Sequence, residues 1–215
     1  MGERQRCLWP QYAFDVIPLD FMSSIYEAFI REDEEEARAK KKTEERSTKP
    51  KKTSKKGVVY TPGFLVDFML DAVLPWDSDE WNVRVCDPAC GSGIYLVKAY
   101  QRLIHRWRRA NAWQKPTASV LREILANNLF GVDVNEHAVR VASLSLYLTM
   151  CDEIEPRYYF SRVKFPPLRK KRLLDADFFR EDVAGLRSGE NQDEYDLVVG
   201  NPPWGKNTAG DLAKQ

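Results

Sequence analysis

The feature that most constrains this chain is the string DPACGSG at residues 87–93, which stands between a short apolar run and a helical one. Residues 82–87 (NVRVCD) predict a strand, and residues 94–110 have the apolar spacing of a helix. Glycines at such a turn permit a left-handed backbone and the close approach of a ligand, while the first turn of the helix offers N–H groups without partners. The string therefore predicts a ligand-binding loop.

The alternation of strand and helix continues along the chain. Further predicted elements are helices at 62–74, 117–127 and 135–150 and strands at 129–134, 172–178 and 195–200. The first of these helices has apolar residues on one face, namely Leu65, Val66, Met69, Leu70 and Val73. Short apolar strands that alternate with helices are typical of a doubly wound parallel sheet, so we expect an α/β fold.

The first 56 residues differ from this pattern. Residues 14–30 have apolar side chains at helical spacing, and we expect a helical segment within residues 1–30. Residues 31–56 contain no aromatic and no large aliphatic side chain, which indicates a charged linker. The basic end of this linker is either a solvated connector or a contact to nucleic-acid phosphates. Residues 57–215 are then expected to form the main domain.

Charge and composition narrow the function. The chain has 33 Lys and Arg against 32 Asp and Glu residues, so its net charge of +1 excludes a uniformly basic nucleic-acid coat. No apolar run approaches the ~18 residues that cross a bilayer, and the N-terminus has no signal-peptide core. We expect a cytoplasmic protein without membrane contact. Cys86 and Cys90 lack further ligands at zinc spacing, which favours buried reduced thiols over a metal site.

Three carboxylates stand where predicted strands end. Asp87 precedes the glycine loop and would meet a positively charged ligand group. Asp133 would accept hydrogen bonds from ribose hydroxyls, or cap the following helix. Its distance of 40 residues from Gly93 exceeds the usual ~20 and argues against a nicotinamide dehydrogenase. Asp177, expected to end the third strand, would bind an adenine with Phe178, or be an exposed acid beside a core ring.

The last motif carries the most chemistry. Asn201, Pro202, Pro203 and Trp204 follow the strand predicted at 195–200. The prolines fix the backbone, so the Asn201 carboxamide oxygen and the Pro202 carbonyl can both accept from one planar NH2 group. Such a group is a poor nucleophile because its lone pair is delocalised, and two acceptors favour the pyramidal nitrogen that attacks. Trp204 would stack a flipped base, worth about 1–3 kcal/mol against a flipping cost of similar size.

In the order DPACGSG, GVDVN, DADF and NPPW, these motifs resemble those of the N6-adenine DNA methyltransferases of bacterial restriction–modification and defence systems. The upstream string GVVYTP resembles the motif that this family places before the glycine loop, with Val59 where the family usually has a tyrosine. This order is the gamma arrangement. The segment IPLDFMSSIYEAFI is similar to the family's N-terminal helix, and the resemblance covers about residues 15–205.

The resemblance implies a Rossmann-like methyltransferase fold with S-adenosylmethionine as methyl donor and no metal. The residues that it implies for cofactor binding are Tyr60, Thr61, Pro62, Asp87, Pro88, Ala89, Gly91, Gly93, Asp133, Asp177 and Phe178. Thr61 and its neighbours would border the methionine end, Asp87 would face its ammonium, and Asp133 would hold the ribose. The catalytic motif that holds the target adenine of double-stranded DNA would be Asn201, Pro202, Pro203 and Trp204.

The family's fold has seven strands, and about four are predicted here. In the family, the region that recognises the DNA sequence normally follows the catalytic core. We therefore expect a partial domain with weak or no methylation by this chain alone. The rest of the domain, or a specificity or defence subunit, would be its partner.

Two other functions stay open. Protein glutamine, RNA guanine and N4-cytosine methyltransferases present a planar nitrogen to a similar Asn-Pro-Pro motif. Alternatively, the chain is a non-catalytic module that binds cofactor or DNA within a defence complex. The basic clusters at residues 106–109 and 169–172 would then contact phosphates, or simply be solvated surfaces.

Overall fold

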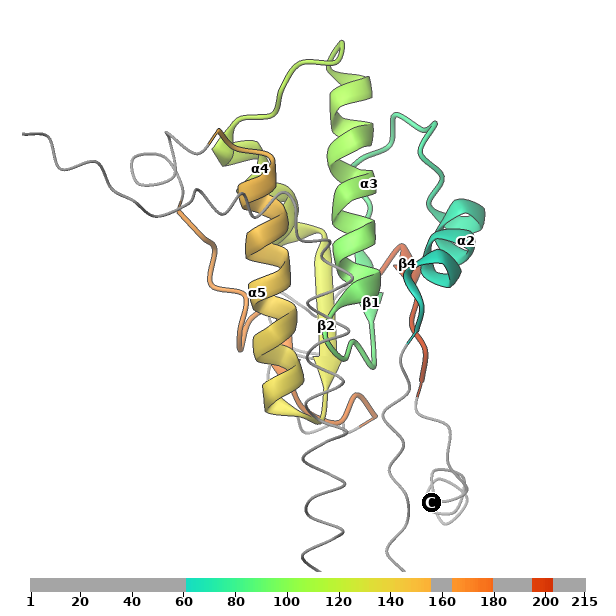
Figure 1. Ribbon diagram of the computed structural model, residues 1–215, viewed down its shortest axis with the longest axis vertical. Coiled ribbons are helices and arrows are strands. Elements are labelled where there is room, and N and C mark those ends of the chain that lie inside the picture. Colours follow the sequence, from blue (N-terminus) through green and yellow to red (C-terminus); the bar gives the residue numbers. More distant parts are fainter. Residues whose placement is uncertain (1–60, 156–163, 180–194, 203–215) are drawn as a thin grey trace, which may run out of the picture.

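The computed structural model describes residues 61–155, 164–179 and 195–202 (Figure 1). Within these ranges the elements are, in chain order, helix α2 (Gly63–Val73), strand β1 (Val85–Asp87), helices α3 (Ile94–Ala110) and α4 (Ala118–Asn127), strand β2 (Leu129–Asp133), helix α5 (Glu136–Asp152) and strands β3 (Leu173–Asp175) and β4 (Leu197–Val198). Every element predicted within these ranges is present. The segments predicted at 14–30 and 31–56 lie outside the described residues, so that division of the chain stays a prediction.

Local signals set the helix limits. Thr117 begins α4 because its hydroxyl accepts from the Val120 N–H at 3.4 Å. Asn135 begins α5 by accepting from the His137 N–H at 2.9 Å, so Asn135 rather than Asp133 is the cap of this helix. Of the helices in the described ranges, none could serve as a transmembrane span.

The four strands of the described ranges form one parallel sheet in the order β3-β2-β1-β4. β1 is central, since Val85 pairs with Leu129 of β2 on one side and with Leu197 of β4 on the other. The chain adds β2 and β3 on one side of β1 and then returns to the other side for β4. Parallel sheets bind ligands where this order reverses, at the carboxyl ends of the strands. The predicted α/β class with a parallel sheet is confirmed.

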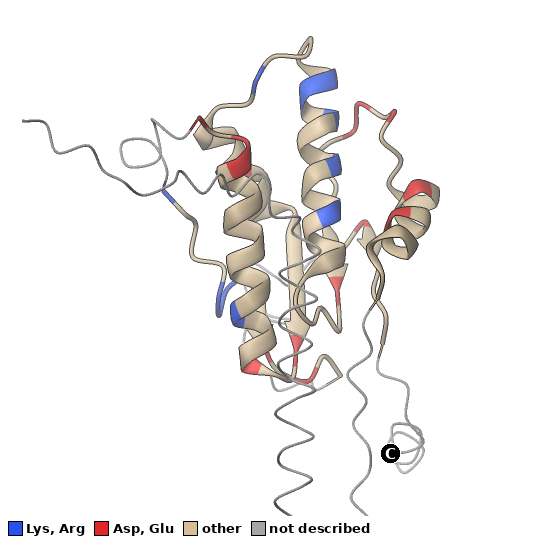
Figure 2. Ribbon diagram, in the orientation of Figure 1, with Lys and Arg blue, Asp and Glu red and all other residues tan. Residues whose placement is uncertain are grey.

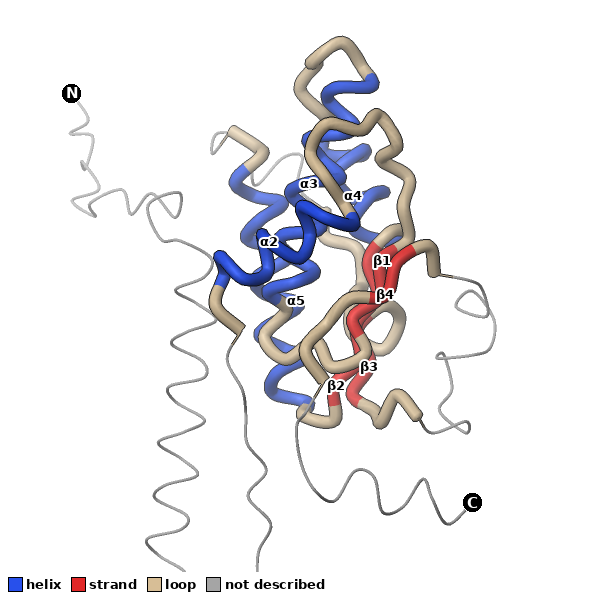
Figure 3. The backbone as a smooth tube through the Cα atoms, turned by 90° about the vertical axis from the view of Figure 1, so that its right-hand side faces the viewer, coloured by secondary structure: helices blue, strands red, loops and turns tan. Residues whose placement is uncertain are grey.

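The described helices pack on one face of the sheet (Figures 1 and 3). Because side chains alternate along a strand, Val85, Leu129 and Leu173 join the main core beneath the helices. Val132 and Leu174 belong to a separate, smaller cluster. In a doubly wound sheet helices cover both faces, whereas the helices of the described ranges cover one.

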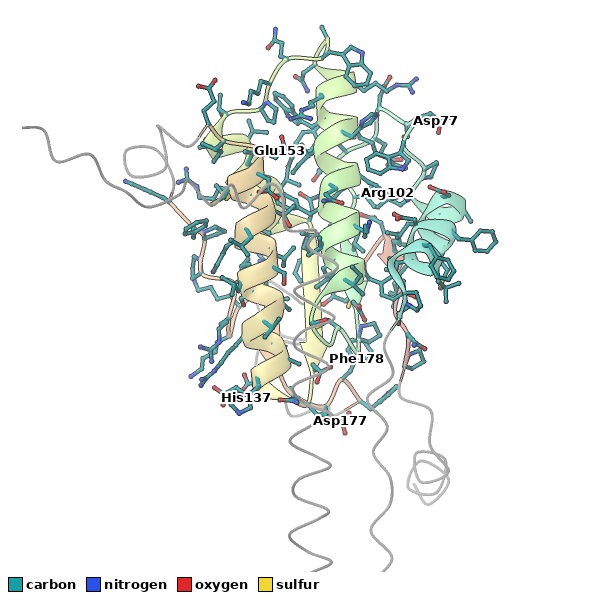
Figure 4. All side chains as sticks on the ribbon, viewed as in Figure 1. Asp77, Arg102, His137, Glu153, Asp177 and Phe178 are labelled. Atoms are coloured by element: carbon teal, nitrogen blue, oxygen red, sulfur yellow. The ribbon has the colours of Figure 1, made fainter. Side chains whose placement is uncertain are left out.

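A buried arginine joins α2 to α3 (Figure 4). The Arg102 guanidinium lies 2.7 Å from the Asp71 carboxylate and 3.3 Å from that of Asp67, and the arginine side chain is 1% exposed. Its central carbon lies 4.7 Å from the centre of the Trp76 ring. Lys98 adds an ion pair to Asp67 at 3.1 Å. Charge as well as apolar packing therefore fixes α2 against α3.

Only part of the apolar face predicted for α2 is buried. Val66 and Leu70 are buried against the core, as predicted. Leu65, Met69 and Val73 are instead exposed by 41%, 37% and 50%. The ion pairs with α3 explain the difference, because they turn the acidic side of α2 toward α3 and leave the remaining apolar side facing solvent.

The basic cluster at the end of α3 serves the fold and offers little to phosphates. Arg106 is buried and donates to two carbonyls of the segment between α2 and β1 at 2.8 and 2.9 Å. Arg108 pairs with Glu153, and Arg109 pairs with Asp79 at 2.8 Å. The blue stripe along α3 in Figure 2 is thus largely engaged in internal contacts. The phosphate-contact interpretation of this cluster is wrong for the buried member.

Strand β4 is short and apolar, which is typical of a buried parallel strand. Val198 is 56% exposed, while Val199 is 8% exposed. The cause is the position of β4 at the edge of the four-stranded sheet in the described part of the chain, where one side of the strand and one face lack a neighbour.

We predict that Arg102→Ala lowers the free energy of unfolding by about 2–3 kcal/mol, because it removes the partner of two carboxylates and leaves a gap beside Trp76. The exposed pair of Arg140 and Glu136 on α5 provides a matched control, and Arg140→Ala should leave stability nearly unchanged. Urea unfolding followed by circular dichroism measures both variants. Equal losses would contradict the structural role assigned to Arg102.

Candidate active site

The glycine loop follows β1 at the carboxyl edge of the sheet. It is tied to β2 by the Cys90 N–H, which donates to the Val132 carbonyl at 2.9 Å. Gly91 and Gly93 have φ of 52° and 89°, a left-handed backbone that glycine adopts without steric cost. A Cβ at Gly93 would lie 2.9 Å from the Cβ of Ala142, so α5 packs closely on the loop because residue 93 has no side chain.

Asp133 holds this loop from the neighbouring strand. One of its carboxylate oxygens accepts from the Gly91 N–H at 2.9 Å, and the other accepts from the Asn135 N–H at 2.8 Å. One side chain therefore fixes both the loop and the start of α5. Each carboxylate oxygen has a second lone pair, so Asp133 keeps the capacity to accept from ligand hydroxyls.

Asp87 ends β1 and is 1% exposed. Its Oδ1 accepts from the Ala89 N–H at 3.1 Å, whereas its Oδ2 has no hydrogen-bond partner among the described residues. The pKa of Asp87 is raised to about 7: burial is the largest cause, the Ala89 N–H acts against it, and the charge of Asp133 adds to it. A buried carboxylate oxygen without a partner suits a cationic ligand group.

The segment after β4 meets this carboxylate. The Val199 N–H donates to the Cys86 carbonyl at 2.9 Å, which extends the β1–β4 pairing and brings Gly200 beside Asp87. A Cβ at residue 200 would overlap the Asp87 Oδ1. Glycine at this position therefore lets the acidic end of β1 and the start of the Asn-Pro-Pro motif lie in contact.

Asn201 is held by the segment that precedes α2. Its Nδ2 donates to the Thr61 Oγ1 at 3.1 Å, across 140 residues of sequence. Thr61 is 6% exposed, so this hydrogen bond is sheltered from solvent. The contact sets the plane of the carboxamide, because its nitrogen is bonded to Thr61 and its oxygen must then point away from Thr61. Three motifs that lie far apart in sequence thus meet at the carboxyl ends of β1 and β4.

Acidic residues gather along this edge (Figure 2). Asp87, Asp133 and Asp175 are the last residues of β1, β2 and β3. The prediction that the third strand continues to Asp177 is wrong, because β3 ends at Asp175. Asp177 instead lies in a turn, where its Oδ1 accepts from the Phe179 N–H at 3.0 Å.

Asp177 and Phe178 lie at the same end of the molecule as the strand ends (Figure 4). Asp177 is exposed, and Phe178 is half-buried against Val132 and Leu174. This arrangement fits the simpler interpretation, an exposed acid beside a core ring, and it also leaves both side chains at the edge where a ligand would lie.

Some predicted site residues have no described position, and two residues near the site were not predicted from the sequence. Tyr60, Pro203 and Trp204 lie outside the described residues. Gly200 was missed, although a glycine between an apolar strand and Asn-Pro-Pro is a signal of close backbone approach. Tyr95 was also missed: it is buried in the first turn of α3, and burial, then the charge of Asp87, raises its pKa.

A hollow of ≈ 350 Å³ lies elsewhere, at the amino ends of the strands. It is lined in part by Arg84, Phe130 and Arg172, with both guanidiniums stacked on the Phe130 ring at 5.1 and 4.9 Å. None of the sequence motifs contributes to its lining. We therefore place the candidate site at the carboxyl edge, where the motifs converge.

The chain is similar to known methyltransferases. The sequence pattern of the family described as "MmeI, DNA-methyltransferase domain" matches residues 78–215. The type II methyltransferase M.VspI of a Vibrio species is 28% identical over 153 residues, which is 71% of this chain and 26% of that protein. The type II restriction enzyme and methyltransferase RM.Eco57I of Escherichia coli is 22% identical over 242 residues, or 95% of this chain and 24% of that protein. The adenine-specific methyltransferase BrxX of Escherichia coli is 32% identical over 85 residues, or 39% of this chain and 7% of that protein.

The chain spans about a quarter or less of the length of these relatives. The family pattern covers more than half of the chain and includes both the glycine loop and the Asn-Pro-Pro motif. The chain therefore belongs to the MmeI DNA-methyltransferase domain family.

Proposed function

We propose that this chain is the cofactor-binding and catalytic part of a DNA methyltransferase that transfers a methyl group from S-adenosylmethionine to N6 of a flipped adenine. The observation that carries the proposal is the contact of Asp87, beside the glycine loop, with Gly200, which directly precedes Asn201. Direct methyl transfer requires donor and acceptor sites side by side in a fixed orientation. The β1–β4 pairing provides that adjacency.

The residues around the loop fit S-adenosylmethionine. The partnerless, buried Oδ2 of Asp87 suits the ammonium of its methionine part. A Cβ at Gly91 would meet no atom within 4 Å, so there is room for a ligand over the loop. Asp133, which accepts a hydrogen bond from the Gly91 N–H, is suited to accept hydrogen bonds from the ribose hydroxyls. Asp177 and Phe178 are suited to bind the adenine of the cofactor. When bound, the cofactor supplies an activated methyl group on a positively charged sulfur.

The chain's own residues would prepare the acceptor. With its nitrogen bonded to Thr61, Asn201 presents its carboxamide oxygen as an acceptor for one hydrogen of the target amino group. The Pro202 carbonyl would accept the other hydrogen, and Trp204 would stack the base. Two acceptors on one amino group favour a pyramidal nitrogen with an available lone pair. The rate then depends on orientation and local electrostatics.

We propose double-stranded DNA as the substrate. The carboxylates at the ends of β1, β2 and β3 make this edge acidic, which favours a cationic cofactor and disfavours the DNA backbone. Contacts to phosphates are therefore assigned to surfaces away from this edge or to a specificity subunit. Cys86 and Cys90 are buried free thiols, which suits the reducing cytoplasm.

The acceptor is tested by incubating the chain with labelled S-adenosylmethionine and duplex DNA, RNA or protein, followed by digestion of the products. We expect label in N6-methyladenine, at a low level for this chain alone. Label in N4-methylcytosine, in methylated guanine of RNA or in protein glutamine would replace the proposed acceptor by one of the other planar nitrogens.

We predict saturable binding of S-adenosylmethionine by calorimetry, and a loss of affinity of about tenfold or more in Asp87→Asn, because an amide cannot form a charge-assisted bond to an ammonium. Asp77→Asn is the matched control: it makes the same change at an exposed residue in the loop after α2 (Figure 4) and should leave the affinity unchanged. The absence of binding by folded protein, or equal loss in both variants, would count against the proposed cofactor site.

We also predict a pH dependence of stability that is specific to Asp87. Its folded-state pKa of about 7 lies above the ordinary value of 3.8. The folded state therefore binds this proton more tightly, and the stabilising contribution, complete below about pH 4, is lost as the pH rises through about 7. Asp87→Asn should thus gain stability relative to the unaltered chain between about pH 5 and about pH 8. Urea unfolding at both pH values measures the gain, and a difference independent of pH would contradict it.

Thr61→Val removes the hydroxyl that fixes Asn201 and nearly preserves volume. We predict a fall of about tenfold or more in the single-turnover rate of methyl transfer, because the carboxamide loses its fixed orientation. Thr61→Ser keeps the hydroxyl and should retain most of the rate. Because Thr61 is also expected to border the methionine end of the cofactor, the rates are compared at saturating S-adenosylmethionine. A Thr61→Val protein as fast as the unaltered chain would show that this hydrogen bond does not orient Asn201.

A further inference from the structure

Helix α2 has an outer face that is entirely apolar. Its inner face, formed by Val66 and Leu70, packs on the core, and Asp67 and Asp71 pair with α3. The residues of the outer face are Phe64, Leu65, Phe68, Met69, Ala72 and Val73. Phe64 and Phe68 are 76% and 74% exposed. Figure 4 shows side chains that project from α2 away from α3.

This face is larger than scattered surface residues explain. Two mostly exposed phenylalanines with three half-exposed aliphatic side chains amount to roughly 500 Å² of contiguous apolar surface, about the largest patch that a monomeric protein usually leaves uncovered. No charged residue interrupts it, because both acids of α2 are directed toward α3. A helix with apolar side chains on both its faces is typically buried between two partners.

We propose that residues 14–30 of the same chain dock on this outer face of α2. The spacing of Leu19, Met22, Tyr26 and Phe29 predicts a helix with one apolar stripe. Ile25 and Phe21 widen this stripe on one flank, and Asp20, Ser24 and Glu27 fall on the opposite side of that predicted helix. One apolar stripe and one polar side are what a helix needs to cover a neutral apolar surface and leave its other side in water.

The position of this segment in the chain supports the pairing. The first stretch outside the described ranges, residues 1–60, directly precedes Thr61 and α2. Thirty residues, the length of the stretch 31–60, would span about 30 Å root-mean-square as a random coil, while α2 is only about 16 Å long. The tethered segment is then present near α2 at about millimolar effective concentration, which favours it over partners in free solution.

The docking has a consequence for the candidate site, although it does not rest on the proposed function. α2 begins two residues after Thr61, whose hydroxyl accepts from Asn201. A second helix on the outer face of α2 would hold this segment from the outside, as Arg102 holds it from the inside.

Hydrogen exchange of the full chain, read by mass spectrometry, tests the proposal. We expect amides of residues 14–30 to exchange at least tenfold more slowly than those of the linker at 31–56. The double variant Phe64→Ser, Phe68→Ser should abolish that protection while α3 stays protected, because both phenylalanines are exposed and outside the core. Leu144→Ser, which changes a 47% exposed apolar residue on α5, is the control and should leave residues 14–30 protected.

Three outcomes would overturn the proposal. Residues 14–30 could exchange as fast as the linker in the unaltered chain, or keep their protection in the double variant. Sedimentation could also show a dimer that becomes monomeric in the double variant without any change at residues 14–30, which would assign the face to a second copy. None of these readings depends on methyl transfer, so a failure here is distinct from a failure of the proposed function.

Discussion

The parallel pairing of β1 with β4 is the constraint on which the rest of this structure depends. It reverses the order in which strands are added, since β2 and β3 lie on one side of β1 and β4 lies on the other. Backbone bonds from Leu197 to Arg84 and from Val199 to Cys86 fix the register of that pair. Asp87 and Gly200 consequently end in contact, although they are separated by most of the domain in sequence. The glycine loop and the segment that begins with Asn201 both leave the sheet at this point.

The positions of the helices and strands could be predicted well from the sequence, and the burial of individual side chains less well. Strong periodicity and flanking glycines located α3 with its bounds and β2 to within one residue. Periodicity could not tell which side of α2 faces the core, because Leu65 and Leu70 are equally apolar. The orientation depends on the ion pairs of Asp71 and Asp67 with Arg102, which lies 31 and 35 residues away. The charge of Arg106 likewise suggested a surface, whereas the fold uses it to satisfy carbonyls inside.

The site shows the same division. Motif order alone indicated that Asp87, Asp133 and Asn201 belong together, and the strand order supplies the physical reason. What the sequence could not show is the contact of Asn201 with Thr61, which depends on where α2 rests, or the role of Gly200, which only a neighbouring carboxylate makes visible. The end of β3 was misjudged because Asp177 forms its own turn with the Phe179 N–H, a local bond that competes with strand pairing.

The carboxylate of Asp133 has one more consequence. It already accepts from the N–H groups of Gly91 and Asn135 without any ligand, so the loop has its shape before a cofactor arrives. Binding then requires little loss of backbone conformational entropy at this loop, and that loss is the main cost of ordering a flexible binding segment. Association at this edge should therefore proceed by docking into a preorganised surface, with little folding of the loop around its ligand.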